Sequence, residues 1–318
     1  MKIYVKTPAR LHLGLIDLNG DLGRTFGGLG VAIDHPNVVL EAEKSQILKV
    51  SGEKTELTQK LASQFLVAYG IKEKVAIDVN QVIPEHIGLG SGTQLALAIA
   101  ASISRLFSVD GSIHEFAVAM GRTAQSGVGT AVFDQGGLVV DAGKNTKDST
   151  QKIIPLICRQ PFPEEWRFVV AIPNVKKGLA NEAEVSAFKQ LPPMAPEAVG
   201  KICRLTMMKL LPAVAEKDIK SFGEAVTQVQ CVVGDSFAQT QGGRYSSSAA
   251  SQCIEFLLQN GAYGAGQSSW GPTVYGVVES NEAKETQLKV EAFLEKSVGG
   301  EVFLAKANNR GAIIKVFK

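Results

Sequence analysis

The first eighty residues contain several short segments in which apolar and polar side chains alternate. Residues 3–5, 9–17 and 75–79 follow this pattern, and the second of them reads A-R-L-H-L-G-L-I-D. A period of two predicts β-strands with one buried face, because successive side chains point to opposite sides. Arg10 and His12 stand two positions apart. We therefore expect both to project from the same face of their strand.

Apolar runs with capping signals predict helices, for example with Gly70 after one run and Ser246 as the N-cap of another. Helices are expected at 57–69, 93–106, 113–124, 197–210, 218–233, 246–259 and 282–295. Further strands are expected at 31–33, 38–43, 47–50, 138–140, 166–172, 273–278, 302–305 and 312–316. This order, without a dinucleotide-binding βαβ signature, predicts an α+β fold.

The length of the chain favours two domains, because 318 residues exceed one compact core. The polar, lysine-rich segment 143–152 is typical of an exposed connection between domains. We therefore place the domains at residues 1–158 and 159–318.

Composition excludes several classes of protein. Hydrophobic residues make up 45% of the chain and charged residues 20%, and 33 basic against 31 acidic residues leave a net charge of +2. No basic surface for nucleic acid is indicated, and no apolar stretch is long enough for a membrane span. Residues 1–9 lack a signal-peptide core, so a cytoplasmic location is expected. The scattered cysteines lack the spacing of a structural zinc site.

A glycine-rich loop precedes the predicted helix that starts near Thr93. Glycines alternate with other residues in G-L-G-S-G-T at 88–93, which frees successive backbone N–H groups to turn around an anion. The following helix would add its N-terminal dipole. We predict a phosphate or pyrophosphate site formed by Gly88, Leu89, Gly90, Ser91, Gly92 and Thr93. The spacing is neither that of a P-loop nor that of a Rossmann loop. A plain turn leading into a core helix is the alternative.

Two other segments are rich in glycine: 8–36, which carries a cluster of charged residues, and 261–276. Together with the loop at 88–93, they stand in the order of the motifs of the GHMP superfamily of small-molecule kinases. The resemblance implies an N-terminal domain similar to the second domain of ribosomal protein S5, a ferredoxin-like C-terminal domain, and a ligand between them.

The chain departs from these kinases after its second predicted helix. GHMP kinases commonly carry Ser-Gly-x-Asp there, with an aspartate that helps to deprotonate the acceptor hydroxyl. This chain has Gly129 in place of the aspartate, after Ser126-Gly127-Val128. Glycine has no side chain that could act as a general base. Asp134 could substitute, so an ATP-dependent kinase remains the alternative function.

Five stretches resemble one branch of the superfamily, the β-ribofuranosylaminobenzene 5′-phosphate synthase family. They are residues 10–20, 26–34, 88–94, 241–247 and 261–276, the last containing Q-S-S-W-G-P. The resemblance implies transfer of a phosphoribosyl group from phosphoribosyl pyrophosphate to 4-aminobenzoate or 4-hydroxybenzoate, with loss of pyrophosphate and CO2, in methanopterin-type cofactor biosynthesis. It also implies a homodimer. A protein of this fold that binds a nucleotide or a phosphosugar without catalysis is a third hypothesis.

This reaction assigns roles to the polar residues of the three segments. Arg10, Arg24 and Arg244 are candidates to bind phosphate, and His12 or an arginine to orient the acceptor's carboxylate. Mg²⁺ would accompany the pyrophosphate, with Asp17 and Asp21 as its candidate ligands. The catalytic candidates are His12, Arg10, Asp17 and Arg24, and the substrate-binding candidates are Arg244, Gln267, Ser268, Ser269 and Trp270.

Each of these residues also has a purely structural interpretation. His12 could be a hydrogen-bonded core histidine, and Trp270 could serve core packing. Ion pairs within the cluster could account for its arginines and aspartates, and Asp21 could be a turn residue. Arg122, at the end of a predicted helix, is more typical of a surface charge that complements the helix dipole. The remaining alternatives are loop roles for Arg244, Ser268 and Ser269.

Overall fold

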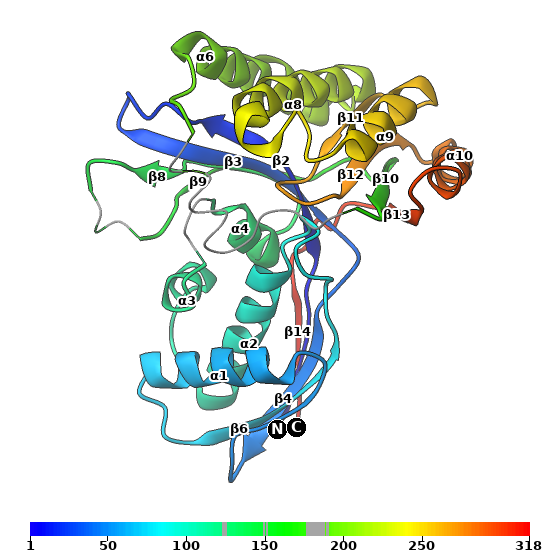
Figure 1. Ribbon diagram of the computed structural model, residues 1–318. Helices are drawn as coiled ribbons and strands as arrows, with labels where there is room; N and C mark the ends of the chain where they lie inside the picture. The colour runs from blue at the N-terminus through cyan, green and yellow to red at the C-terminus, as the bar shows by residue number, and fades with distance from the viewer. Residues whose placement is uncertain (123–125, 149, 151, 176–187, 189–190) are drawn as a thin grey trace.

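The structure is a computed structural model of the 318-residue chain. It describes residues 1–122, 126–148, 150, 152–175, 188 and 191–318. Three sheets and their helices form two lobes that meet at β2 (Figure 1). None of the helices in these ranges is long and apolar enough to cross a membrane.

The first sheet has the order β14-β1-β4-β6-β5 and brings the two ends of the chain together. Lys2 in β1 pairs with Phe317 in β14, and the termini lie side by side in Figure 1. Helices α1 and α2 pack beside this sheet, and α2 is buried along most of its length because it is rich in alanine, leucine and isoleucine. The elements are β1 (Lys2–Lys6), β4 (Val39–Ser45), β5 (Lys49–Gly52), β6 (Lys74–Gln81), β14 (Ile313–Phe317), α1 (Thr55–Ala68) and α2 (Ser91–Phe107).

The second sheet has the order β2-β3-β7-β9, with β8 paired to β3. Its elements are β2 (Ala9–Asp17), β3 (Arg24–Ile33), β7 (Leu138–Asp141), β8 (Lys144–Asn145) and β9 (Leu156–Gln160), with α3 (Ile113–Ala119) and α4 (Val128–Asp134) nearby. Sequence periodicity did not predict α4, a seven-residue helix whose Val128 and Val132 pack against this sheet. The domain boundary predicted between residues 158 and 159 falls inside β9, while β14 returns to the first sheet.

The third sheet is antiparallel, with the order β11-β12-β10-β13. In chain order this is 4-1-3-2 read from β13, the ferredoxin-like arrangement expected for the C-terminal half. Its elements are β10 (Trp166–Pro173), β11 (Gly264–Gln267), β12 (Val274–Glu279), β13 (Gly300–Ala305), α9 (Ser248–Gln259) and α10 (Ala283–Glu295). Ser247 caps α9 through Ala250 N–H, so the cap lies one residue after the predicted Ser246.

Helix α8 (Ile219–Gln241) packs against both β2 and β11 and so joins the two lobes (Figure 1). It follows α6 (Pro196–Leu205), the π-helical turn η1 (Thr206–Leu210) and α7 (Leu211–Glu216). Close approach to β11 depends on Gly223, where an added Cβ would lie 2.2 Å from the carbonyl oxygen of Tyr263. This contact fixes α8 over the region where the candidate site lies.

Replacing Gly223 with alanine tests this packing. The new Cβ cannot be accommodated without separating α8 from β11, so we expect the free energy of unfolding to fall by about 1–3 kcal/mol or more. Gly200→Ala is the matched control, because an added Cβ in α6 meets no atom within 4 Å. That variant should gain up to about 1 kcal/mol from helix propensity. Equal stability of the two variants in urea unfolding would contradict the packing argument.

Candidate active site

A cavity of about 250 Å³ lies between β2, the N-terminal turn of α2, α8 and the turn between β11 and β12. It brings together residues from all three glycine-rich segments. The predicted site residues that line it are Arg10, His12, Thr93, Arg244, Gln267, Ser269 and Trp270. As the strand period predicted, Arg10 and His12 lie on the same face of β2, both toward this cavity.

The carbonyl oxygen of Gly88 joins these segments. It accepts a hydrogen bond from Arg10 Nη1 at 2.5 Å and another from Ser268 Oγ at 2.6 Å. The same Ser268 hydroxyl accepts the backbone N–H of His12 at 2.9 Å. Ser268 is fully buried and does not line the cavity, so the structure places it as a link between the walls.

Gln230 of α8 makes a second link, at a β-bulge. In the pairing of β2 with β3, His12 opposes Gly30 and Gly14 opposes Leu29, which leaves Leu13 as the extra residue. Gln230 Nε2 donates to Leu13 O at 2.6 Å, and Gln230 Oε1 accepts Gln267 N–H at 2.8 Å. Gln230 thus satisfies the bulged backbone and holds β11 beside it.

The predicted phosphate loop has the backbone conformation that its glycines allow. Gly88 and Gly90 adopt φ values of +88° and +84°, and Gly90 is the N-cap residue of α2. Leu89 is buried and its carbonyl accepts Arg10 N–H at 3.1 Å, while Thr93 faces the cavity. The first turn of α2 therefore begins at the cavity wall, where its unpaired N–H groups favour an anion.

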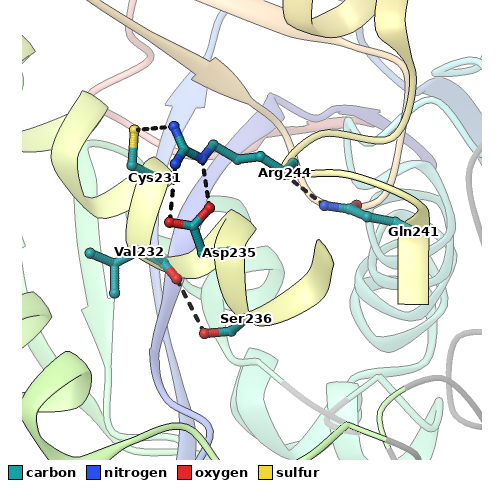
Figure 2. Close-up of polar contacts among 6 residues, drawn as sticks. All are labelled: Cys231, Val232, Asp235, Ser236, Gln241 and Arg244. Atoms are coloured by element: carbon teal, nitrogen blue, oxygen red, sulfur yellow. Dashed lines mark hydrogen bonds and ion pairs between the residues drawn. The ribbon is translucent and has the colours of Figure 1, made fainter. Parts of the chain in front are cut away.

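Three arginines line this cavity. Arg10, Arg122 and Arg244 contribute to the lining, and no aspartate or glutamate is among the described residues that form it. Figure 2 shows that Arg244 is nevertheless paired from outside: its Nε and Nη2 bind the two carboxylate oxygens of Asp235 at 2.7 and 3.1 Å. Sequence reasoning did not place Arg122 here, since it lies beyond α3 and reaches the site only in three dimensions.

Aromatic rings form another part of the wall. Trp270 is packed edge-on against Phe237, with ring centroids 4.6 Å apart, and against Phe188, with centroids 5.5 Å apart. All three residues line the cavity. A planar aromatic ligand could contact this cluster while its anionic groups meet the arginines. Trp270 therefore serves packing and lines the cavity as well.

His12 is neutral in this environment. It is 8% exposed, and burial together with the positive charge of Arg10 lowers the pKa of its imidazole to about 3. At neutral pH it therefore presents one N–H donor and one acceptor nitrogen and carries no charge.

Arg24, Asp17 and Asp21 lie outside the cavity lining, as do Ser268 and loop residues 88–92. Arg24 donates from Nε to Ala142 O at 2.8 Å and from Nη2 to Gly143 O at 2.9 Å, so it braces β3. Asp17 Oδ1 accepts the N–H groups of Asn19 and Gly20 in a tight turn, and Asp21 is exposed beyond that turn. Asp17 is thus bonded within its own turn and Arg24 to the distant loop after β7, and their roles in the site stay predictions.

As magnesium ligands, Asp17 and Asp21 stay a prediction. One oxygen of Asp17 is already shared by two backbone donors, and neither side chain lines the cavity. Within the residues that can be described, no three His, Cys, Asp or Glu side chains are grouped as metal ligands. No chemical step is therefore assigned to a metal held by these residues.

Gly129, at the position of the kinase aspartate, lines the cavity, and an added Cβ there would lie 3.0 Å from Thr93 Cγ2. Asp134, the possible substitute, sits at the other end of α4, exposed, and 4.0 Å from His114 Nε2. Its carboxylate is not part of the cavity wall.

Comparison with known proteins identifies the class. The model of the GHMP kinases N terminal domain matches residues 56–140, and that of the GHMP kinases C terminal domain matches residues 210–296. A crystal structure of mevalonate diphosphate decarboxylase from Staphylococcus aureus superposes with a TM-score of 0.71 at 14% identity, covering 99% of this chain and 98% of that one. The fold is therefore that of the GHMP superfamily.

Sequence relatives narrow the class further. The β-ribofuranosylphenol 5′-phosphate synthase of Archaeoglobus fulgidus is 36% identical over 99% of this chain and 100% of its own length. The protein of the same name from Methanothermobacter thermautotrophicus is 33% identical over 99% of both chains. The chain belongs to the β-ribofuranosylphenol 5′-phosphate synthase family of enzymes, which confirms the family predicted from the sequence.

The buried neutral His12 makes stability depend on pH. Its folded-state pKa lies below the unfolded value near 6.5, so the unfolded chain takes up a proton that the folded chain excludes. The free energy of unfolding is unaffected by this group above pH 6.5. Below that pH it falls by up to about 1.4 kcal/mol per pH unit, down to the folded-state pKa of His12. Urea unfolding between pH 7.5 and 4.5 should show a steeper loss of stability in the wild type than in His12→Gln, because the other titrating groups are common to both. Parallel curves would refute it.

Removing the Ser268 hydroxyl should weaken the junction of the three segments. Ser268→Ala leaves the buried N–H of His12 without its acceptor, which costs about 1–3 kcal/mol. Gly88 loses one of its two donors, so turnover should fall as well. Ser248→Ala, at an exposed position in α9, is the control and should leave both unchanged. Unfolding and steady-state kinetics check both effects; wild-type behaviour of Ser268→Ala would show that the link is dispensable.

Proposed function

We propose that the protein is a decarboxylating phosphoribosyltransferase. It joins phosphoribosyl pyrophosphate to 4-hydroxybenzoate or 4-aminobenzoate and yields the β-ribofuranosyl benzene 5′-phosphate, CO2 and pyrophosphate. The word phenol in the names of the relatives favours the hydroxy acid. The product would serve methanopterin-type cofactor synthesis, as the family resemblance implies.

The observation that carries this proposal is the lining of the cavity, which combines three arginines and an aromatic cluster and contains no acidic residue among those described. Both substrates are anions, and the benzoate also contains an aromatic ring. Kinases of this superfamily commonly use an aspartate to help deprotonate the acceptor, although some lack it, and Gly129 offers no such group. The lining therefore suits the transferase better than phosphoryl transfer.

The chemistry can be followed bond by bond. The ring carbon that bears the carboxylate attacks C1 of the ribose, and the bond from C1 to the pyrophosphate oxygen breaks. The bond between the ring and the carboxylate then breaks, and its electron pair restores the aromatic ring as CO2 leaves. Fixed N–H donors at the start of α2 and the guanidinium of Arg10 would stabilise the charge that grows on the leaving group.

The ring would rest against Trp270 and Phe237, which hold it in an apolar part of the cavity. Neutral His12 would donate or accept one hydrogen bond without adding charge. Magnesium is proposed only as a counter-ion that the donor carries on its pyrophosphate. A homodimer stays a prediction from the family resemblance.

Release of labelled CO2 tests the reaction. The protein is incubated with Mg²⁺, phosphoribosyl pyrophosphate and carboxyl-labelled 4-hydroxybenzoate or 4-aminobenzoate. We expect labelled CO2 that depends on phosphoribosyl pyrophosphate, which separates transfer from simple decarboxylation. A parallel reaction with ATP and small alcohols provides the comparison with a kinase.

Two results would overturn the proposal. Consumption of ATP on an alcohol, with no CO2 from either acid, would support the kinase. Binding of phosphoribosyl pyrophosphate without turnover of either acid would support a binding protein.

A further inference from the structure

The backbone of Arg122 lies at the end of α3, whereas its side chain lies at the start of α2. Its backbone N–H donates to Ala117 O at 2.7 Å, just beyond the C-terminus of α3. Its guanidinium instead lies over Gly92 in the first turn of α2, where an added Cβ would meet Nη1 at 3.3 Å. A cation at a helix N-terminus opposes the helix dipole, so this arrangement is unfavourable by itself.

Burial increases that cost. Arg122 Nε is inaccessible to solvent and has no hydrogen-bond partner among the described residues. Desolvation lowers the pKa of the Arg122 guanidinium. The group nevertheless stays protonated at neutral pH. The neighbouring residues 123–125 are threonine, alanine and glutamine, so none of them is acidic. Arg122 as a whole is half-buried, and a partly buried charge without a counter-charge among the described residues lowers stability, a penalty that a bound anion would reduce.

The other two arginines of the cavity differ from Arg122. Arg10 Nη1 is bonded to the carbonyl oxygen of Gly88, and Arg244 is held in a two-point ion pair by Asp235 (Figure 2). Both guanidinium groups already have acceptors in the free protein. Arg122 combines a place in the cavity lining, contact with the first turn of α2, and a buried N–H for which the described residues provide no acceptor.

We infer that Arg122 binds the pyrophosphate of the donor against the first turn of α2, and that the described residues of the free protein leave this guanidinium without a counter-charge until the anion arrives. The inference rests on the proposed function, which supplies pyrophosphate as the anion. As the bond from C1 to oxygen breaks, negative charge grows on the leaving group. The guanidinium N–H groups and the α2 backbone meet that charge together.

Binding of inorganic pyrophosphate to the full-length protein tests this role by calorimetry. Arg122→Met should weaken the affinity by about 10- to 100-fold, the range expected for losing charged hydrogen bonds. Without pyrophosphate, the same variant should be at least as stable as the wild type, because a buried charge has been removed. Arg122→Lys, which keeps the charge without the planar fork, should lie between the two.

A glycine pair supplies a test that keeps Arg122 itself. Gly92→Ala places a methyl group against the guanidinium and should weaken pyrophosphate binding, although alanine favours the helix. Gly200→Ala makes the same exchange in α6, away from other atoms, and should leave binding unchanged. Because both variants favour helix formation, a difference in affinity places the anion at the turn that Gly92 shares with Arg122. This pair keeps the inference falsifiable if Arg122→Met does not fold.

The outcomes separate this inference from the transferase reaction. Wild-type affinity for pyrophosphate in Arg122→Met or, if that variant does not fold, in Gly92→Ala would overturn the role of Arg122, even if labelled CO2 is released normally. Absence of pyrophosphate binding to the wild type would overturn it too. Conversely, if the wild type binds pyrophosphate through Arg122 but releases no CO2 from either acid, the role stands and the proposed reaction fails.

Discussion

The site depends on one shared acceptor, the carbonyl oxygen of Gly88. Its two hydrogen bonds come from Arg10, near the start of the chain, and from Ser268, near its end. Because the Ser268 hydroxyl also accepts His12 N–H, one small group of atoms fixes β2, the glycine loop and the β11–β12 turn relative to one another. The cavity walls therefore form only when both lobes are folded and in contact, and α8 completes them through Gln230.

The positive charge of its lining makes this cavity suited to anions. A wall with three arginines and no described carboxylate is costly in a folded protein, because its cations are partly removed from water. Asp235 relieves Arg244 from outside, and Gly88 provides an acceptor for Arg10. The positive charge of the cavity wall favours ligands that carry several negative charges. The same superfamily fold can thus serve a transferase in place of a kinase, since Gly129 removes the carboxylate that a kinase would use.

Local patterns predicted much of the fold and part of the site. Alternation in β2 was sufficient to place Arg10 and His12 on one face, and the glycines at 88 and 90 adopt the positive φ values that their loop requires. The cluster of Asp17, Asp21 and Arg24 was different. These side chains are close in sequence and polar, but turn and loop backbone groups bond Asp17 and Arg24, and Asp21 faces solvent. None of the three lines the cavity, so their roles in the site stay predictions.

The sequence by itself determined the family, the α+β fold and the glycine loop, since these follow from short-range patterns and from motifs that keep their order. Only the tertiary structure decided which charges meet. Arg122 follows α3 in sequence, yet its guanidinium lies on α2, because α3 ends at Ala119 and the chain turns back toward the cavity. Helix α4 and the partners of Gln230 were decided in the same way. Such contacts join residues far apart along the chain, and neither period nor spacing records them.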